Sequence, residues 1–306
     1  MDNNKQFKTD DAHSYDGMVE NFDSFTDQFS HYAVDEILAR VPVAGRSELL
    51  DIGCGSGVVT LAAAKAFGPQ SRITGLDLSP QMLAFAGRKA DDAGLADRIR
   101  FVEGDAEALP FADSSFDSVV SLYAWRHLPD PAAATREAFR VLRAGGTFVL
   151  AVGSGPALMS ADGVRAAIAA PWRMLARKRG LELTACDHLD ALIEQHLPRP
   201  KQTEVAEWSA GHHSFSGSLT DLLTTAGFRV TGSGWSGRSY AVDTPEEYWR
   251  LQATFSTIAR KRIADAAPEK VEQMKAEFTE QCEAVQRRGG KLLYRVGASI
   301  STAVKR

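Results

Sequence analysis

The chain has 306 residues, of which 44% are hydrophobic and 24% are charged, a composition typical of a soluble globular protein with a sizeable core. Its formal net charge of −4 gives no electrostatic basis for binding nucleic acid or an anionic membrane, so we expect neither partner. No stretch reaches the roughly 18 consecutive apolar residues of a spanning helix, and the polar N-terminus does not resemble a signal peptide, so we expect a cytoplasmic protein without membrane insertion.

The three cysteines, Cys54, Cys186 and Cys282, are far apart and have no C-x-x-C spacing. They therefore indicate neither a disulfide framework nor a zinc site, and we expect three reduced thiols. The sequence leaves the oligomeric state open, and a homodimer is one option.

Residues 1–47 are predicted to form an N-terminal helical lid. The first 17 residues are polar, and aromatic side chains then recur at helical spacing, which predicts an amphipathic helix continuing to about residue 41. These side chains are Phe22, Phe25, Phe29 and Tyr32. The aromatic stripe fits packing against the core, and it also fits a lid over a ligand; the two interpretations are compatible.

Between residues 48 and 153, short apolar segments alternate with helical patterns. Strands are predicted at 48–53, 72–78, 99–105, 116–124 and 146–153, and helices at 58–68, 79–94 and 130–142. In the second helix Ser79 is the expected N-cap and Pro80 the first helical residue. Alternation of this kind predicts crossover connections and hence an α/β fold with a doubly wound, mostly parallel sheet.

After residue 153 the alternation is interrupted. Residues 154–212 are predicted to form a helical cap insertion, with helices at 163–180 and 187–197. Residues 213–306 are expected to complete a seven-stranded sheet with a helix and strand in 219–242 and a last strand at 291–305. Between them, residues 244–288 are predicted to be helices that add to the cap.

The stretch "LLDIGCGSGVV", residues 49–59, places Gly53, Gly55 and Gly57 between a strand and a helix. Glycines there allow close approach of a ligand to the backbone, and the helix directs free amides toward it; a purely structural turn is the alternative. Asp77 and Asp105 end the next two strands, where doubly wound folds bind ligands, and a carboxylate can accept two hydrogen bonds from a ribose diol.

The spacing of the loop helps to distinguish between cofactors. A dinucleotide fingerprint requires G-x-G-x-x-G/A, but Val58 stands where the third small residue is expected. The sequence also lacks the Gly-Lys-Ser/Thr of a phosphate-binding loop. Both departures disfavour a pyrophosphate site.

Residues 48–153 resemble the cofactor domain of the class I S-adenosylmethionine-dependent methyltransferases, in particular the ubiquinone/menaquinone-biosynthesis-like type. The resemblance lies in "LLDIGCGSG", "ITGLDLSPQML", "VEGDAEALPF", "FDSVVSLYAWRHLPDP" and "EAFRVLRAGGTFVLA", which occur in the family's order. It implies a Rossmann-like fold and S-adenosyl-L-methionine as the cofactor.

The resemblance also implies roles for individual residues. It places Asp51, Gly53, Gly55, Gly57, Ser121 and Leu122 around the methionine portion, Asp77 on the ribose hydroxyls, and Met82, Asp105 and Ala106 around the adenine. The chain departs from the family pattern on the substrate side, because Arg126 stands where a histidine is common and Trp125 where a smaller aliphatic residue is common. Ala144 also replaces a frequent proline before Gly145.

Methyl transfer from a sulfonium depends largely on alignment, and a general base is needed only if the acceptor must lose a proton. His127, after the fourth predicted strand, is the candidate base, with a structural histidine as the alternative. His212 and His213 are an alternative base or a pair of metal ligands, although adjacent residues in a strand point to opposite faces and no nearby carboxylate completes a metal site. We therefore expect no metal.

The variable half of the chain contains further candidates for the substrate site. Its aromatic residues fit either the wall of a pocket for a flat acceptor or the core: Trp172, Trp208, Trp235, Tyr240 and Trp249. The basic stretch "RMLARKRG", residues 173–180, fits either an acidic substrate group or a solvated helix face.

Together these features predict a methyltransferase acting on an oxygen, nitrogen or carbon nucleophile of a small molecule, a specialised metabolite or a quinone-like acceptor. An alternative is a protein that uses S-adenosylmethionine structurally, for a non-methylating reaction or for regulation. A nicotinamide-dependent dehydrogenase is a third, weaker interpretation.

Overall fold

The computed structural model describes residues 8–9, 12–15, 17–42, 47–156, 160–184, 187–197 and 218–306. The chain divides into two compact units. Unit 1 contains residues 1–155, 215–236 and 298–306, and unit 2 contains residues 156–214 and 237–297. The second unit is therefore inserted into the first along the sequence.

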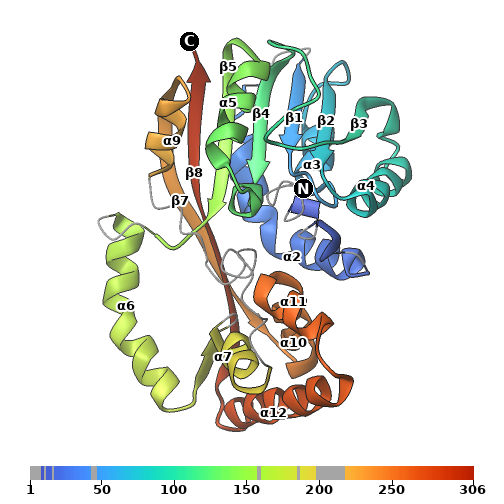
Figure 1. Ribbon diagram of the computed structural model, residues 1–306. Coiled ribbons are helices and arrows are strands. Elements are labelled where there is room, and N and C mark those ends of the chain that lie inside the picture. The colour runs from blue at the N-terminus through green and yellow to red at the C-terminus, as the bar shows by residue number, and fades with distance from the viewer. Residues whose placement is uncertain are drawn as a thin grey trace. The chain divides into compact units, whose positions relative to one another are not determined.

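Unit 1 is built on a sheet whose first five strands follow the predicted pattern (Figure 1). They are β1 (Glu48–Ile52), β2 (Arg72–Asp77), β3 (Ile99–Glu103), β4 (Phe116–Leu122) and β5 (Leu142–Gly153). Pairing in the order β3-β2-β1-β4-β5 is parallel throughout, so their carboxyl ends meet at one edge of the sheet. We call this end of the sheet the carboxyl edge, as distinct from the lateral edges formed by the outermost strands. It is where a doubly wound fold binds its ligand.

Two long strands complete the sheet. β8 (Lys291–Lys305) pairs antiparallel with β5, placing Thr147 opposite Val304, and β7 (Phe228–Val242) pairs with β8. In the described residues, unit 1 thus has a mostly parallel seven-stranded sheet, as predicted. An eighth strand, β6 (Glu182–Thr184), pairs with β8 at Lys291–Leu293 in unit 2. It was not predicted, because three residues are too few to show a strand periodicity.

Two of the connecting helices begin after residues whose side chains cap them. α4 (Pro80–Asp92) starts after Ser79, whose hydroxyl accepts a hydrogen bond from Met82 N, and α5 (Pro131–Val141) starts after Asp130, whose carboxylate accepts one from Ala133 N. These caps satisfy backbone amides that have no partner within the helix. The other short helices of this region are α3 (Val58–Ala66), η1 (Ala96–Arg98), η2 (Ala124–His127) and α9 (Leu219–Thr225).

The core of unit 1 lies between the sheet and these helices. Trp125 is fully buried there, its ring centroid 5.5 Å from that of Phe148, and its indole Nε1 donates to Thr135 Oγ1 at 3.1 Å. The indole nitrogen therefore keeps a hydrogen bond although it is removed from water. A large residue at position 125 is thus explained by packing inside the fold.

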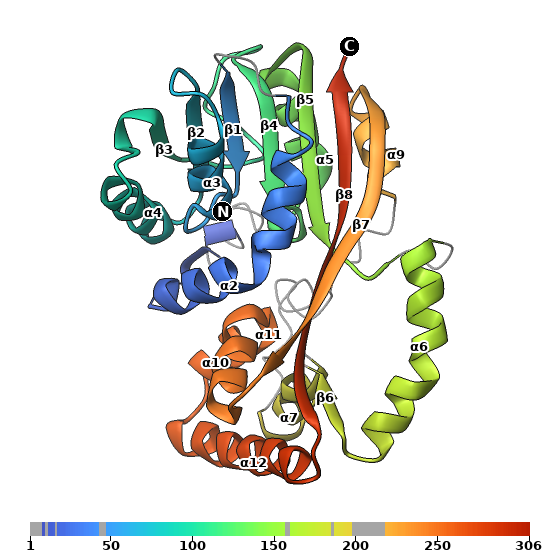
Figure 2. The ribbon, with the colours of Figure 1, turned by 180° about the vertical axis from the view of Figure 1, so that it is seen from behind.

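The N-terminal helix α2 (Val19–Leu38) confirms the predicted amphipathic helix. Phe25, Phe29 and Tyr32 are buried, and α2 packs against α3, β4 and β5. Figure 2 shows α2 on one face of β4 and β5, whereas α5 covers the opposite face. Most of the aromatic stripe therefore belongs to the core, while Phe22 is only half-buried.

Unit 2 is mainly helical. Its elements are α6 (Ala161–Lys178), β6, α7 (Asp187–His196), α10 (Pro245–Phe255), α11 (Thr257–Ala264) and α12 (Pro268–Arg287). The buried ring of Phe278 lies 5.8 Å from Tyr248 and 5.2 Å from Trp249, centroid to centroid, so aromatic side chains form the interior of this unit. The helices predicted at 163–180, 187–197 and 244–288 are confirmed.

Candidate functional site

The loop after β1 contains three glycines with left-handed backbone torsions, φ +71° at Gly53, +52° at Gly55 and +84° at Gly57. Gly53 N donates to Leu76 O at 2.7 Å, which fixes the loop to the end of β2. A Cβ added at Gly53 would overlap the Cβ of Ala124 in η2. Glycine is required there for two independent reasons, the backbone torsion and the close approach of another loop.

Gly57 is the N-cap residue of α3, in the left-handed backbone conformation and without a side-chain cap. An added Cβ there would lie 2.7 Å from Leu61 Cδ1 and 3.1 Å from Ala86 Cβ. Beside it, Ser56 is buried, and its hydroxyl has no hydrogen-bond partner among the described residues. A buried hydroxyl without a partner is costly, which suits a loop that receives a polar ligand.

Asp77 ends β2 directly opposite this loop. Its Oδ2 accepts a hydrogen bond from Gly55 N at 2.8 Å, and its Oδ1 accepts one from Ser79 N at 3.0 Å. Loss of water raises the pKa of Asp77, and the hydrogen bonds from the backbone and the nearby His127 oppose that rise only in part. The half-buried carboxylate is therefore held rigidly, with acceptor capacity left for further donors.

Asp51 lies below the loop on β1 and is almost fully buried. Its Oδ2 accepts a hydrogen bond from Thr60 Oγ1 at 2.6 Å. Burial raises the pKa of Asp51 to about 7, the negative charge of Asp77 adds to the rise, and the hydrogen bond from Thr60 opposes it. Both carboxylates would be easier to ionise next to a positively charged ligand.

The raised pKa of Asp51 predicts a dependence of stability on pH. Between pH 3.8, its ordinary pKa, and pH 7 the folded protein keeps a proton on Asp51 that the unfolded chain has released, so the free energy of unfolding falls as pH rises. We expect this to contribute on the order of 1 kcal/mol per pH unit. Urea denaturation at pH 5, 6 and 7 should show a steeper fall for the native protein than for Asp51→Asn, which keeps an acceptor for Thr60; parallel curves would contradict the prediction.

The loop after β3 provides the next set of predicted residues. Ala106 and Met82 are buried, whereas the Asp105 side chain is one-third exposed. Asp105 Oδ1 accepts a hydrogen bond from Glu107 N at 2.9 Å, and its Oδ2 accepts one from Lys8 Nζ at 2.7 Å. The structure therefore adds Lys8 and Glu107 to the region where the sequence predicts an adenine site.

Ser121 and Leu122 lie at the carboxyl end of β4. Both are buried, and Ser121 Oγ donates to Ile52 O at 2.8 Å, so its hydroxyl already bonds to the neighbouring strand. As successive residues of a strand, the two side chains point to opposite faces of the sheet. Any contact of this pair with a ligand would therefore involve backbone atoms more readily than the hydroxyl.

His127 ends the short helix η2 and is half-buried. Its ring centroid lies 6.3 Å from that of Tyr15 in an edge-to-face arrangement, and it is close enough to Asp77 for the two charges to interact. The preceding Tyr123 has φ +66°, and its hydroxyl lies 2.6 Å from the hydroxyl of Tyr32 on α2. The sequence did not single out Tyr15 or Tyr123, because both contacts join segments far apart in the chain.

The other candidates are dispersed or not described. His212, His213, Trp208 and Cys186 lie outside the described residues. Trp172 is 73% exposed, Trp249 is buried beside Phe278, and Tyr240 is half-buried. Trp235 donates from Nε1 to Ser154 O at 2.8 Å in unit 1.

The basic stretch 173–180 forms the end of α6 and the turn after it. Arg177 donates to Thr184 Oγ1 at 2.7 Å, an exposed contact within unit 2. Cys54 and Cys282 are free, buried thiols. Within the described ranges, no group of three or more metal-ligating side chains occurs, and no helix is long and apolar enough to cross a membrane.

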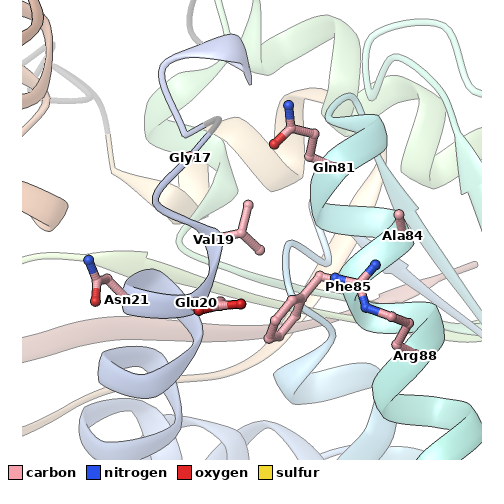
Figure 3. Close-up of a pocket in the computed structure, with 8 residues that line it drawn as sticks. All are labelled: Gly17, Val19, Glu20, Asn21, Gln81, Ala84, Phe85 and Arg88. Carbon is pink, nitrogen blue, oxygen red and sulfur yellow. The ribbon is translucent and has the colours of Figure 1, made fainter.

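A hollow of about 350 Å³ lies beside the carboxyl edge, between the start of α2 and α4. Figure 3 shows Glu20 from α2, and Phe85 and Arg88 from α4, around the space between the two helices. The guanidinium of Arg88 lies 5.5 Å from the centre of the Phe85 ring. The other lining residues are Gly17, Val19, Asn21, Gln81 and Ala84.

The residues at the carboxyl edge fit a nucleoside cofactor with a positively charged centre. The three glycines have torsions that exclude a side chain, Ser56 has a buried hydroxyl without a partner among the described residues, and Asp77 has acceptor capacity opposite the loop. Asp51, Gly53, Gly55, Gly57 and Asp77 are brought together by β1, β2 and α3, while Met82, Asp105 and Ala106 lie on the next elements along the sheet.

Comparison with known proteins identifies relatives of this region. Residues 50–150 match a protein family described as a methyltransferase domain. The chain is 45% identical over 101 residues to a ubiquinone/menaquinone biosynthesis C-methyltransferase of Nitrobacter hamburgensis, covering 33% of this chain and 40% of the relative. It is 37% identical over 121 residues to a demethylmenaquinone methyltransferase of Lactiplantibacillus plantarum, covering 40% and 51%.

Both matches are partial, since the chain spans about half or less of the length of these curated relatives. Among solved structures, the YcgJ protein of Bacillus subtilis is similar, with a TM-score of 0.52 and 20% identity over 90% of this chain and 99% of that one. This likeness shows the fold, with the strand order described above.

Proposed function

We propose, from the premise that residues 50–150 form a class I S-adenosylmethionine-dependent methyltransferase domain, that this protein transfers a methyl group from S-adenosylmethionine to a small molecule. The observation that supports this most directly is the fixed pair of the glycine loop and Asp77, joined by the Gly55 N to Asp77 Oδ2 hydrogen bond of 2.8 Å. That hydrogen bond holds a loop without side chains at three positions beside a carboxylate suited to a diol.

The cofactor-binding roles follow from this placement. Asp77 would accept hydrogen bonds from the ribose hydroxyls, and Met82, Asp105 and Ala106 would surround the adenine. Asp51, Gly53, Gly55 and Gly57 would lie around the methionine portion, with Ser121 and Leu122 beside it. The support is that these residues follow β1, β2, β3 and β4, whose carboxyl ends form one edge of the sheet.

S-adenosylmethionine, when bound, supplies a methyl group that is already activated by the sulfonium charge. The protein's own task is then to orient, because alignment of the reacting groups can account for several kcal/mol of the barrier. The positive charge of the bound cofactor would favour the ionised forms of Asp51, on β1, and Asp77, at the end of β2. If the acceptor must lose a proton on methylation, His127 is the group placed to accept it at a ring nitrogen.

The acceptor is proposed to be a specialised metabolite or a quinone-like compound, methylated at oxygen, nitrogen or carbon. The support is the similarity over 101 and 121 residues to a ubiquinone/menaquinone biosynthesis C-methyltransferase and a demethylmenaquinone methyltransferase. We further propose that residues 1–47 act as a lid and that residues 154–212 and 244–288 act as a cap that selects the acceptor. The homodimer, the cytoplasmic location and the small-molecule acceptor stay predictions.

Calorimetric titration of cofactor-stripped protein with S-adenosylmethionine, S-adenosylhomocysteine and NAD tests the proposal. Micromolar binding of the first two without NAD binding is the expected result, followed by a search for S-adenosylhomocysteine formed with candidate acceptors. Substrate turnover without S-adenosylhomocysteine would instead support the alternative, a protein that uses the cofactor structurally. Failure of both adenosyl compounds to bind folded protein would overturn the proposed function.

His127→Ala is expected to lower turnover at least 10-fold while changing cofactor affinity less than about 3-fold, since a general base typically contributes 100-fold or more. Single-turnover kinetics with the identified acceptor, together with calorimetry, would separate the two effects. His31→Ala is the matched control, because His31 is an exposed histidine of α2 that pairs only loosely with Asp27 at 3.8 Å. Wild-type turnover in the His127 variant would exclude it as the base.

A further inference from the structure

Lys8 binds two carboxylates at the carboxyl edge of the sheet. Its Nζ lies 2.7 Å from Asp105 Oδ2 and 2.6 Å from Glu107 Oε2. The side chain of Lys8 is only 12% exposed and that of Glu107 only 11%. Exposed ion pairs contribute little to stability, but a largely buried ammonium between two acceptors is a charge-assisted contact of a stronger kind.

The local charges keep this contact ionised. Burial alone would lower the pKa of Lys8, but its hydrogen bonds and charge interactions with Asp105 and Glu107 outweigh that effect and raise it. Without the ammonium, two carboxylates two residues apart would repel each other in a poorly hydrated place. Lys8 is therefore part of what holds the Asp105 side chain in its present orientation.

Glu107 extends the cluster toward His127. Its Oε1 accepts a hydrogen bond from Asp130 N at 2.8 Å, and Asp130 caps α5 directly after the segment that contains His127. Glu107 N in turn donates to Asp105 Oδ1. One ammonium thus connects the N-terminal segment with the loop after β3 and with the start of α5.

Two further contacts of the N-terminal segment involve the other loops. Tyr15 lies edge-to-face against His127, at 6.3 Å, and against Phe22, at 5.2 Å. Phe22 Cε1 is 3.5 Å from where a Cβ would lie on Gly55. Lys8, Tyr15 and Phe22 therefore contact, in chain order, the loops after β3, β4 and β1.

We propose that Lys8 anchors the N-terminal segment across the carboxyl edge and thereby determines how long the cofactor stays bound. This rests on the proposed function, since Asp105 is there assigned to the adenine. When Lys8 holds Asp105 and Glu107, the aromatic residues that follow it stay on the glycine and His127 loops, and a ligand beneath them cannot leave. When the Lys8 ammonium separates from Asp105 and Glu107, the N-terminal segment can move away from these loops and the ligand can dissociate.

The test uses Lys8→Ala, Lys8→Arg and a matched control, Arg143→Ala. Arg143 Nη1 forms an ion pair with Asp117 at 2.6 Å, at the opposite, amino end of β4. Stopped-flow displacement of bound S-adenosylhomocysteine should give a dissociation rate about 10-fold faster in Lys8→Ala, with the association rate changed much less, as is usual for the loss of single contacts. Lys8→Arg, which keeps the charge and can contact both carboxylates, should dissociate within about 3-fold of the native protein.

A second measurement does not depend on the ligand. Hydrogen exchange of the free protein should show faster exchange in residues 12–22 of Lys8→Ala and native protection in Lys8→Arg and Arg143→Ala. Unchanged protection in Lys8→Ala would overturn the proposed anchor, whether or not an adenosyl compound binds. Failure of both adenosyl compounds to bind would refute the proposed function and leave this measurement valid. Equal dissociation rates in Lys8→Ala and native protein, or equal acceleration in Arg143→Ala, would also overturn the anchor.

Discussion

Asp77→Ala is expected to weaken the binding of S-adenosylmethionine by at least about 100-fold. A hydrogen bond to a charged acceptor contributes about 1.5–3 kcal/mol, and the proposed contact with the ribose diol has two of them. The substitution also removes the acceptor for Gly55 N and Ser79 N, so the glycine loop loses its fixed position before any ligand arrives. Calorimetric titration with S-adenosylmethionine measures the effect directly.

Asp117→Ala is a stringent control for that experiment. Asp117 Oδ2 accepts a hydrogen bond from Glu48 N at 2.8 Å, so this substitution also removes a carboxylate that holds a backbone amide of β1. It acts at the opposite end of the sheet, however, where no cofactor contact is proposed. Unchanged affinity in Asp77→Ala, or an equal loss in Asp117→Ala, would remove Asp77 from the binding site.

Gly53→Ala is expected to destabilise the protein by about 2–5 kcal/mol and to abolish measurable cofactor binding. Alanine pays roughly 1–2 kcal/mol for the left-handed torsion of +71°, and forcing a methyl group into a packed contact costs about 1–3 kcal/mol more. The collision is with Ala124, which begins the helix that ends at His127, so relief of the clash must displace that segment. Urea denaturation and calorimetry check the two effects.

The chain provides a matched variant that separates torsion from collision. Gly94 has φ +66°, and an added Cβ there would meet nothing within 4 Å. Gly94→Ala should therefore cost only the torsional part, about 1–2 kcal/mol, and leave cofactor affinity unchanged. If both variants lose the same stability and bind the cofactor equally well, the close approach of Ala124 to the loop has no functional importance.

Much of unit 1 was predictable because its signals are local. The caps at Ser79 and Asp130, the prolines that follow them and the apolar strands all act within a few residues, so the sequence locates most of these elements to within one or two positions. The exception is β5, which begins at Leu142, four residues before the predicted start, because Gly145 and Gly146 indicated a turn that the strand includes. β6 could not be found in this way, because its three residues form a strand only through pairing with β8. The alternation of elements predicted a doubly wound, mostly parallel sheet, whereas the strand order comes from the structure.

The candidate site also contains some features with a local sequence signal and others that depend on contacts between distant residues. The glycines and Asp77 are visible as a motif, but the hydrogen bond between Gly55 and Asp77 spans 22 residues, and the ion pair of Lys8 with Asp105 spans 97. No local pattern distinguishes Lys8 from any other lysine in a polar N-terminal stretch. Trp125 shows the converse, since its unusual size suggested the substrate side whereas its contacts with Phe148 and Thr135 place it in the core.

The pairing of β5 with β8 has a consequence for synthesis of the chain on the ribosome. Val149 and Leu150 of β5 are fully buried, yet their partners on that side, Thr302 and Ser301, are translated only after the whole of unit 2. Until then β5 is an outer strand of the parallel sheet with unpaired backbone N–H and C=O groups, which makes the nascent chain prone to aggregate. Premature termination anywhere between residues 156 and 297 would therefore leave β5 without its partner strand β8, and such fragments should depend on chaperones to remain in solution.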